Sequence, residues 1–359
     1  MLRNSRIILF CDVCILICIG IVMIYSASSI FAWEKLKDSA YYLRRHTIYF
    51  LIGALSAFWA MSIDYRLLKK YSKPILISSV VLLVILLLVG REIAGAKRWF
   101  RFAGLSFQPS EFAQVAMIIY IADLVSRKKN LIRDFSLGFV PAMAVLGFVD
   151  LLILVQPDLG TAVAMFLVVF IMIFVAGARL WHLGLIIASA IPFLYILIFS
   201  VPYRRARIMA FLNPWQDAKG SGFQIIQSQI ALGSGGLLGA GLGAGKQKLF
   251  YLPAAHTDFI FSIIGEELGL VGNLAVILLF AVLVWLGLRI SSKTKDNFGK
   301  FLTLGLTCLL GLKAVINIGV STGFFPTKGL PLPFISYGGT SLVFDMLSVG
   351  LILNVAKSS

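Results

Sequence analysis

The chain alternates between long apolar segments and short polar ones. A helix needs about 20 apolar residues to cross a bilayer, and ten segments reach or approach that length: 7–29, 47–63, 74–90, 109–126, 136–155, 159–177, 182–201, 259–289, 301–323 and 335–356. This pattern predicts an all-α, polytopic membrane protein with about ten transmembrane helices in one domain, residues 1–359. It also predicts a large extracytoplasmic loop between helices 7 and 8, at about 202–258.

Composition supports the same class. Hydrophobic residues make up 59% of the chain and charged residues 13%, whereas soluble domains have about 45–50% apolar and about 25% charged residues. Arg3 and Arg6 precede the first segment as in a signal peptide, but the apolar run exceeds the roughly 7–15 residues of an h-region. We therefore expect this segment to be retained as a span. Its cysteines, at helical spacing, are expected to pack as small apolar residues.

The net charge of +16 is unevenly placed. Ten spans put both termini on one side, and short basic loops at 64–73 and 127–135 indicate that this side is cytoplasmic. On the outer face, positive residues concentrate at 35–45, 91–101 and 204–248. That placement opposes the usual bias and favours an anionic ligand there, with lipid head groups as the alternative. Nucleic acid is disfavoured because these charges are dispersed among membrane loops.

The first outer loops carry charged residues that could contact a ligand. Lys97 and Arg98 suit a phosphate group. Glu111 and Asp158 either face a ligand or support the first turn of the helix that follows. Within the spans, Lys313 is either functional or paired with a carboxylate.

The stretch 202–258 contains the densest chemistry. Residues 222–232 predict an amphipathic helix at the membrane interface. The glycine run 233–245 fits no nucleotide-binding pattern, and we expect a mobile loop that brings Lys246 and Lys248 toward an anion. Asp258 is either a general base or the N-cap of the next span. The last outer loop, 326–340, is rich in proline and glycine, and such backbone is tolerated at membrane depth only where it is buried or lines a cavity.

Together these motifs resemble the SEDS family, the FtsW/RodA peptidoglycan polymerases, over nearly the whole chain. The resembling segments are Tyr25-Ser-Ala-Ser28, Arg98-Trp99, Gln108-Pro-Ser-Glu111, Gln156-Pro-Asp-Leu-Gly160, Gly233 to Gly245, Lys248, His256-Thr-Asp-Phe-Ile-Phe261, Glu266-Glu-Leu-Gly269 and Pro326 to Gly339. Pro326-Thr-Lys-Gly-Leu-Pro331 is most similar to the FtsW branch. The chain departs from the family at Ala254, where Glu is frequent, and at Gln114, where Lys is frequent.

The resemblance implies a glycosyltransferase that polymerises lipid II into β-1,4 glycan strands and releases undecaprenyl pyrophosphate during septal wall synthesis. It implies a bacterial cytoplasmic membrane protein with both termini cytoplasmic, at the division septum. The implied partners are a class B penicillin-binding protein transpeptidase, other divisome membrane proteins and membrane lipid. A divalent metal ion, Mg or Mn, could share the binding of the pyrophosphate, with Glu111 or Asp158 as candidate ligands, but no ligand set is legible in the sequence.

The alternatives are an elongation- or sporulation-type relative, a lipid II flippase and a non-catalytic division scaffold. Transporters bind near the bilayer midplane, often between inverted repeats. Here no repeat is evident and the polar residues cluster at one face, which favours an enzyme.

In the mechanism that follows, Asp258 takes the proton of the acceptor 4-hydroxyl as it attacks the donor C1 with inversion. General-base assistance of this kind is worth about 10²–10⁴-fold. Cations would hold the pyrophosphate and stabilise developing charge, and Lys97, Arg98, Lys246 and Lys248 are the candidates. The other residues expected to contact substrate are Glu111, Gln156, Asp158, Gln227, His256, Lys328 and Ser336.

Overall fold

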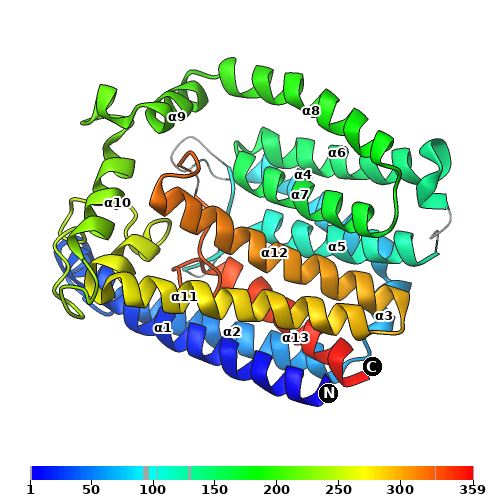
Figure 1. Cartoon of the computed structure of the whole chain (residues 1–359), viewed down its shortest axis with the longest axis horizontal. Coiled ribbons are helices and arrows are strands. Elements are labelled where there is room, and N and C mark those ends of the chain that lie inside the picture. Colours follow the sequence, from blue (N-terminus) through cyan, green and yellow to red (C-terminus); the bar gives the residue numbers. More distant parts are fainter. Residues whose placement is uncertain are drawn as a thin grey trace.

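The computed structural model describes residues 2–90, 92, 97–102, 104–127, 131–327 and 329–358, and it is a helical bundle (Figure 1). A two-stranded hairpin, with Phe100 opposite Phe107, precedes α5. The elements are α1 (Leu2–Leu36), α2 (Tyr41–Ser62), α3 (Arg66–Lys70), α4 (Ser72–Val89), β1 (Phe100–Phe102), β2 (Leu105–Phe107), α5 (Pro109–Arg127), η1 (Leu131–Arg133), η2 (Phe135–Phe139), α6 (Val140–Val155), α7 (Leu159–Val175), α8 (Leu180–Phe199), α9 (Pro202–Leu212), η3 (Pro214–Asp217), α10 (Phe223–Ser234), α11 (Ile260–Lys293), α12 (Asn297–Thr322) and α13 (Thr340–Ser358).

Each of the ten predicted segments contains a helix. Within the described residues, seven helices are long and apolar enough to cross a membrane, and α7 is a shorter apolar helix. The remaining two predicted spans correspond to α2 and α5, whose polar residues lower their mean hydropathy. In α5 these include the buried Glu111, Gln114 and Asp123. The last helix begins at Thr340 rather than 335, since the proline- and glycine-rich stretch before it does not form a helix.

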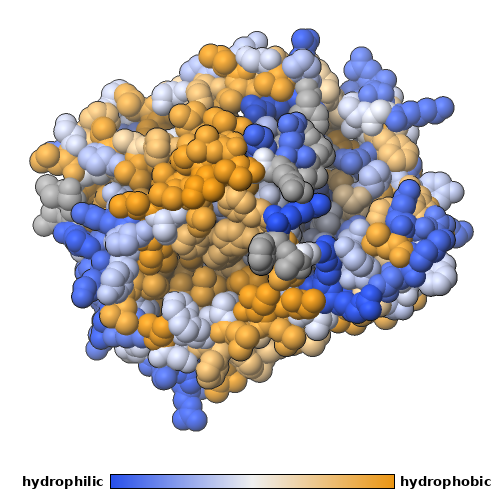
Figure 2. Space-filling view, turned by 180° about the vertical axis from the view of Figure 1, so that it is seen from behind, coloured by the Kyte–Doolittle hydropathy of each residue, from blue (hydrophilic) through white to orange (hydrophobic). Residues whose placement is uncertain are grey.

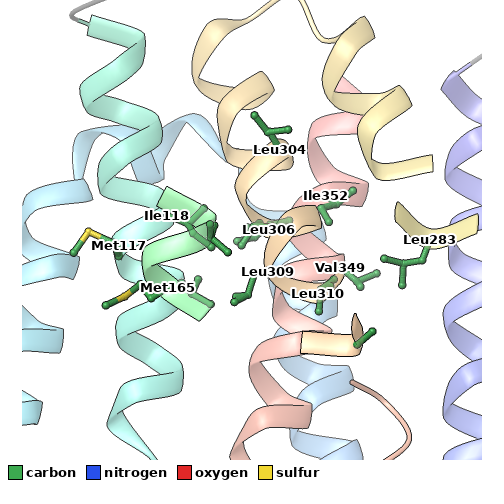
Figure 3. Packing of buried hydrophobic residues seen from close by; sticks show 14 of the residues in the cluster. Met117, Ile118, Met165, Leu283, Leu304, Leu306, Leu309, Leu310, Val349 and Ile352 are labelled. Atoms are coloured by element: carbon green, nitrogen blue, oxygen red, sulfur yellow. The ribbon is translucent and has the colours of Figure 1, made fainter. Parts of the chain in front are cut away.

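The core is centred on α12, which packs against α5, α7, α11 and α13. In Figure 3, Leu306 and Leu309 of α12 lie beside Ile118 of α5 and Met165 of α7, with Val349 of α13 close by. By contrast, α8 lies at the edge of the bundle and is largely exposed (Figure 1). The face seen in Figure 2 has a broad apolar area between more hydrophilic ends, as expected for a bundle that sits in a bilayer.

The predicted loop at 202–258 is largely structured. It contains α9, η3 and α10, and α10 (Phe223–Ser234) corresponds to the amphipathic helix expected at 222–232. After α10 the chain makes glycine-rich turns and reaches α11 at Ile260.

The glycine run is docked on a break in α11 instead of moving freely. Gly269 interrupts α11 with φ 68° and ψ −166°. The amides of Ala240 and Gly241 donate to the carbonyls of Glu266 and Glu267 at 2.9 and 3.0 Å. A Cβ on Gly239, whose φ is +82°, would lie 2.2 Å from the Glu267 carbonyl oxygen. Glycine is therefore needed here for close backbone approach, and the expected mobility is replaced by tight docking.

Candidate active site

A cavity of about 220 Å³ opens where the α6–α7 turn, α8, α9 and the loop after α12 meet. It is lined by Arg98, Pro157, Asp158, Leu159, Gly160, Val163, Leu194, Ile198, Arg204, Arg207, Ile208, Pro326, Thr327 and Gly329. Three of these are arginines and one is an acid, so the lining is cationic.

Each arginine is held by backbone carbonyls. Arg98 donates to the carbonyl oxygens of Gln156, at 3.2 Å, and Pro157 in the α6–α7 turn. On α9, Arg204 donates to the Leu197 carbonyl at 3.0 Å and Arg207 to the Thr327 carbonyl at 3.0 Å. These bonds to neutral carbonyls position the three guanidinium groups at the cavity.

Asp258 lies directly behind this cationic lining. A Cβ on Gly329, which lines the cavity, would lie 3.0 Å from a carboxylate oxygen of Asp258. Burial raises the pKa of Asp258 to about 6, although Arg207, a hydrogen bond from Thr257 and Arg98 all act to lower it. A carboxyl group with a pKa of about 6 is ionised at neutral pH and is basic enough to accept a proton.

The helix-cap interpretation of Asp258 is wrong. The N-cap of α11 is Phe259, and no side chain caps that helix. The carboxylate of Asp258 is therefore not committed to the helix N-terminus.

The backbone around Asp258 is fixed by distant parts of the chain. Asn317 of α12 donates from Nδ2 to the carbonyls of Asp258, at 3.0 Å, and Leu330, at 2.7 Å. The Ser336 hydroxyl donates to the Thr257 carbonyl at 2.6 Å. These bonds join the segment before α11 to the loop after α12, so Ser336 holds the Asp258 segment through its neighbour.

His256 lies in an aromatic cluster. Its ring centroid is 4.5 Å from that of Tyr42, 5.9 Å from Phe31 and 6.0 Å from Tyr337. Burial lowers the pKa of His256 to about 4. The imidazole is therefore neutral at neutral pH, and in this structure it packs against rings.

Asp158 both caps a helix and faces the cavity, the two roles that the sequence allowed. It is the N-cap of α7, accepting from the amide and hydroxyl of Thr161 at 3.3 and 2.8 Å, and it also lines the cavity. Gln108 donates to the same carboxylate at 3.2 Å. Gln156 is buried and contributes its carbonyl to Arg98.

The two lysines of the glycine-rich loop do not line the cavity. The ammonium of Lys248 is 2.6 Å from a carboxylate oxygen of Glu267 and donates to the Ser26 hydroxyl at 3.0 Å. The Lys246 side chain is exposed, while its amide donates to Glu266 at 2.6 Å. Both glutamates thus hold the loop at the break in α11.

Glu111 is buried away from this cavity. It accepts from Lys313 of α12 at 2.6 Å, and Lys313 also contacts Asp345 of α13 at 2.9 Å. The alternative of a Lys313–carboxylate pair is therefore confirmed. Gln114, on the same helix as Glu111, is buried and donates to the Thr161 carbonyl.

The remaining candidates lie apart. Lys97 donates to the Leu87 carbonyl at the end of α4, and Gln227 is half-buried on α10. Lys328 lies outside the described residues.

The described residues contain no group of three His, Cys, Asp or Glu side chains placed to hold a metal ion. Of the two ligands considered, Glu111 is bound to Lys313 and Asp158 to Thr161 and Gln108. The donor set therefore does not match a metal site held by the protein, and the divalent ion stays a prediction.

Arg204 and Arg207 were missed by sequence reasoning as site residues. They were seen only as part of a basic outer loop. Their spacing was the available signal, because residues i and i+3 share one face of a helix. Once α9 is recognised as a helix, the two guanidinium groups have to project from the same side.

Comparison with known proteins adds independent findings. The sequence matches the FtsW/RodA/SpoVE family, described as cell cycle proteins, over residues 6–359. It is 47% identical over 343 residues to a probable peptidoglycan glycosyltransferase FtsW of Geobacter metallireducens, covering 95% of this chain and 92% of that one. It is 44% identical over 350 residues to stage V sporulation protein E of Bacillus subtilis, covering 96% and 95%.

Two solved structures are also similar. One is a chain from a peptidoglycan synthase complex whose polymerization and crosslinking are coordinated, with a TM-score of 0.78 at 30% identity over 98% of this chain and 97% of that one. The other is the rod shape determining protein RodA of Thermus thermophilus, with a TM-score of 0.69 at 27% identity over 98% and 96%.

Proposed function

The chain belongs to the FtsW/RodA/SpoVE family of cell cycle proteins, and from that premise we propose that it polymerises lipid II into β-1,4 glycan strands and releases undecaprenyl pyrophosphate. It is a multi-pass membrane protein and a peptidoglycan glycosyltransferase, the activity that its FtsW relatives bear in their names. One observation carries the assignment of the site: Asp258 lies directly behind Gly329 in the wall of a cavity that Arg98 and Arg207 also line.

The charge of the cavity suits a diphosphate leaving group. Arg98, Arg204 and Arg207 line it against one carboxylate, Asp158. A guanidinium presents its donors in a fork that matches phosphate oxygens. Such donors stabilise the negative charge that grows on the diphosphate as the bond to the sugar breaks.

An apolar groove next to the cavity supports a lipid-linked substrate. Leu159, Val163 and Leu194 line both the cavity and a second hollow between α6, α7 and α8. That hollow is otherwise almost entirely apolar, with Leu154, Phe166, Phe193 and Leu197 among its walls. A polar head in the cavity and a hydrocarbon chain in the groove would place an amphipathic donor across the boundary between them.

In the proposed reaction Asp258 acts as the general base. It accepts the proton of the acceptor 4-hydroxyl while that oxygen attacks C1 of the donor and the diphosphate leaves with the bonding electrons. Attack opposite the leaving group inverts the α-linked donor to a β bond. Ser336 and Asn317 hold the backbone next to Asp258 and so keep the carboxylate in place.

Similarity to the relatives supports the proposed partner and location. One structural neighbour is part of a complex that couples polymerization to crosslinking, which supports a transpeptidase partner of the class B penicillin-binding type. The chain is more similar to FtsW of Geobacter metallireducens than to the sporulation protein of Bacillus subtilis, which supports a division role at the septum. The basic loops at 64–73 and 127–135 support cytoplasmic termini.

The test is polymerisation of labelled lipid II by the purified chain with its transpeptidase partner in detergent. We expect Asp258→Asn to lower the rate by about 10²–10⁴-fold, with expression and partner binding retained. Glu34→Gln removes an exposed carboxylate on α1 and serves as the matched control. Substantial polymerisation by Asp258→Asn would reject the base. Transport of lipid II without glycan synthesis by the unmodified chain would indicate a flippase.

A further inference from the structure

A second cationic cavity lies at the opposite end of the bundle. The two termini lie together there, away from α9 and α10 (Figure 1). The cavity has about 440 Å³ and is bordered by α1, α2 and α13. Arg6 of α1 and Lys357 of α13 supply its charge, and its other walls are Ile7, Phe10, Phe58, Met61, Ser62 and Leu353.

This cavity continues into an apolar groove along the same three helices. Phe10, Met61 and Leu353 line both spaces. The groove then passes between Val13, Cys14, Ile17, Phe50, Ala54, Ala57, Met346, Val349 and Gly350, and none of its lining side chains is charged. The two spaces together are basic at the terminal end and apolar toward the middle of the bundle.

The two cations are not neutralised within the described part of the chain. The ion pairs found there involve Arg44, Arg127, Lys248 and Lys313 and do not include Arg6 or Lys357. Of the eight residues around the cavity, Arg6 and Lys357 are cations, Ser62 carries a small hydroxyl, and the other five are apolar. The opening therefore has positive charge and no acid among its walls.

We propose that this composite cavity binds one anionic phospholipid of the cytoplasmic leaflet. The phosphate contacts Arg6 and Lys357, and an acyl chain lies in the groove between α1, α2 and α13. Basic pockets between transmembrane helices at the cytoplasmic side suit anionic head groups. The site rests on the proposed orientation of the chain and is independent of the glycosyltransferase site at the other end.

Arg6 and Lys357 differ from other basic residues near the same end because they line the cavity. Arg3 lies one helical turn before Arg6 on α1, is exposed, and is not among the residues that line the cavity. Lys295, between α11 and α12, is also exposed and outside it. A general preference for positive charge at the cytoplasmic face would involve all four residues equally, whereas a built site distinguishes them.

Native mass spectrometry of the purified full chain tests the site, with phosphatidylglycerol and phosphatidylcholine as the probes. We expect the unmodified chain to prefer phosphatidylglycerol. Two lost cations near the membrane surface should weaken its binding by roughly thirtyfold in the Arg6→Gln/Lys357→Gln double variant. The Arg3→Gln/Lys295→Gln variant has the same net charge as the first double variant, but it should bind phosphatidylglycerol as tightly as the unmodified chain does. Equal losses in both double variants would overturn the proposal.

A third variant tests the acyl groove. Ala54→Phe places a large side chain in the groove without changing charge, and we expect it to weaken phosphatidylglycerol binding while the melting temperature is retained. Glycerol 3-phosphate, which has the head-group charge and no acyl chain, should not displace the lipid. Displacement by glycerol 3-phosphate, or unchanged binding by a folded Ala54→Phe, would contradict a phospholipid site. Polymerisation of lipid II is measured separately, so failure of either proposal is visible without the other.

Discussion

Two groups of charged side chains near the candidate site differ in their partners: one forms a buried ion pair, and the other binds backbone carbonyls at a cavity. Lys248 and Glu267 form a closed pair, with side chains 3% and 0% exposed. Arg98, Arg204 and Arg207 instead surround a cavity and are held by carbonyls. Lys248 and the three arginines all belong to basic parts of the sequence, yet only the arginines line a cavity. A lysine with a buried partner is occupied within the fold, whereas arginines in excess over acids at a cavity can receive an anion.

The difference has an energetic basis. A buried ion pair offsets a large desolvation cost with its own attraction, so removing one partner is far more harmful than removing both. Charges at a cavity keep part of their hydration until a ligand replaces it. Stability measurements should therefore respond to the first group and activity measurements to the second.

The largest expected effect is on the closed pair. Glu267→Gln leaves the Lys248 ammonium buried without an anion, which should lower the free energy of unfolding by about 3–5 kcal/mol. Thermal melting in detergent measures this. The Lys248→Met/Glu267→Leu double variant should recover much of the loss because no buried charge remains. An unchanged melting temperature for Glu267→Gln would show that Lys248 has another partner.

The next effect is on the arginines. Arg207→Gln should lower kcat/KM for lipid II by roughly 10–150-fold, since hydrogen bonds to charged groups contribute about 1.5–3 kcal/mol. Arg205→Gln on the same helix is the matched control, because Arg205 is exposed and does not line the cavity. Equal effects of the two variants on kcat/KM would remove the distinction between the cavity and the surrounding basic surface.

A smaller effect is expected from pH. Burial raises the pKa of Asp258 to about 6, and a base must be unprotonated to work. Below pH 6, kcat/KM should therefore fall by about tenfold per unit. Arg207 lowers this pKa, so Arg207→Gln should move the acid limb to higher pH. A profile that is flat from pH 7 to 5 would be inconsistent with Asp258 as the base.

The smallest effect is expected at Lys246. Its amide, not its exposed side chain, holds the loop to Glu266. Lys246→Gln should change the free energy of unfolding by less than about 0.5 kcal/mol, measured by melting, and leave polymerisation close to that of the unmodified chain. A large loss of polymerisation would place the Lys246 side chain on the substrate and extend the cationic site to the loop.

The sequence predicted the helices well because each apolar segment is a local signal. The family resemblance also pointed to Asp258 as the catalytic carboxylate, and that role stays a prediction. The partners of Lys248 could not be predicted, because Glu267 and Ser26 reach it only after α1, the glycine-rich loop and α11 have packed together. The sequence distance between Ser26 and Glu267 is 241 residues.

The glycine run was misjudged for a related reason. A high glycine content indicates mobility in isolation, but at Gly239 it permits a contact that any side chain would block. Only the position of the break at Gly269, next to Glu266 and Glu267, distinguishes the two roles. In the sequence Gly269 is one of three glycines close together, with Gly265 and Gly272, and nothing marks it as the position of the break.

The bonds from Asn317 and Ser336 to the segment around Asp258 also set an order in biosynthesis. Asp258 leaves the ribosome about 60 to 80 residues before these partners, which belong to α12 and the loop that follows it. While the chain is still being made, the aspartate has no fixed backbone around it. Assembly of the site therefore waits until α12 and the loop that follows it have been made.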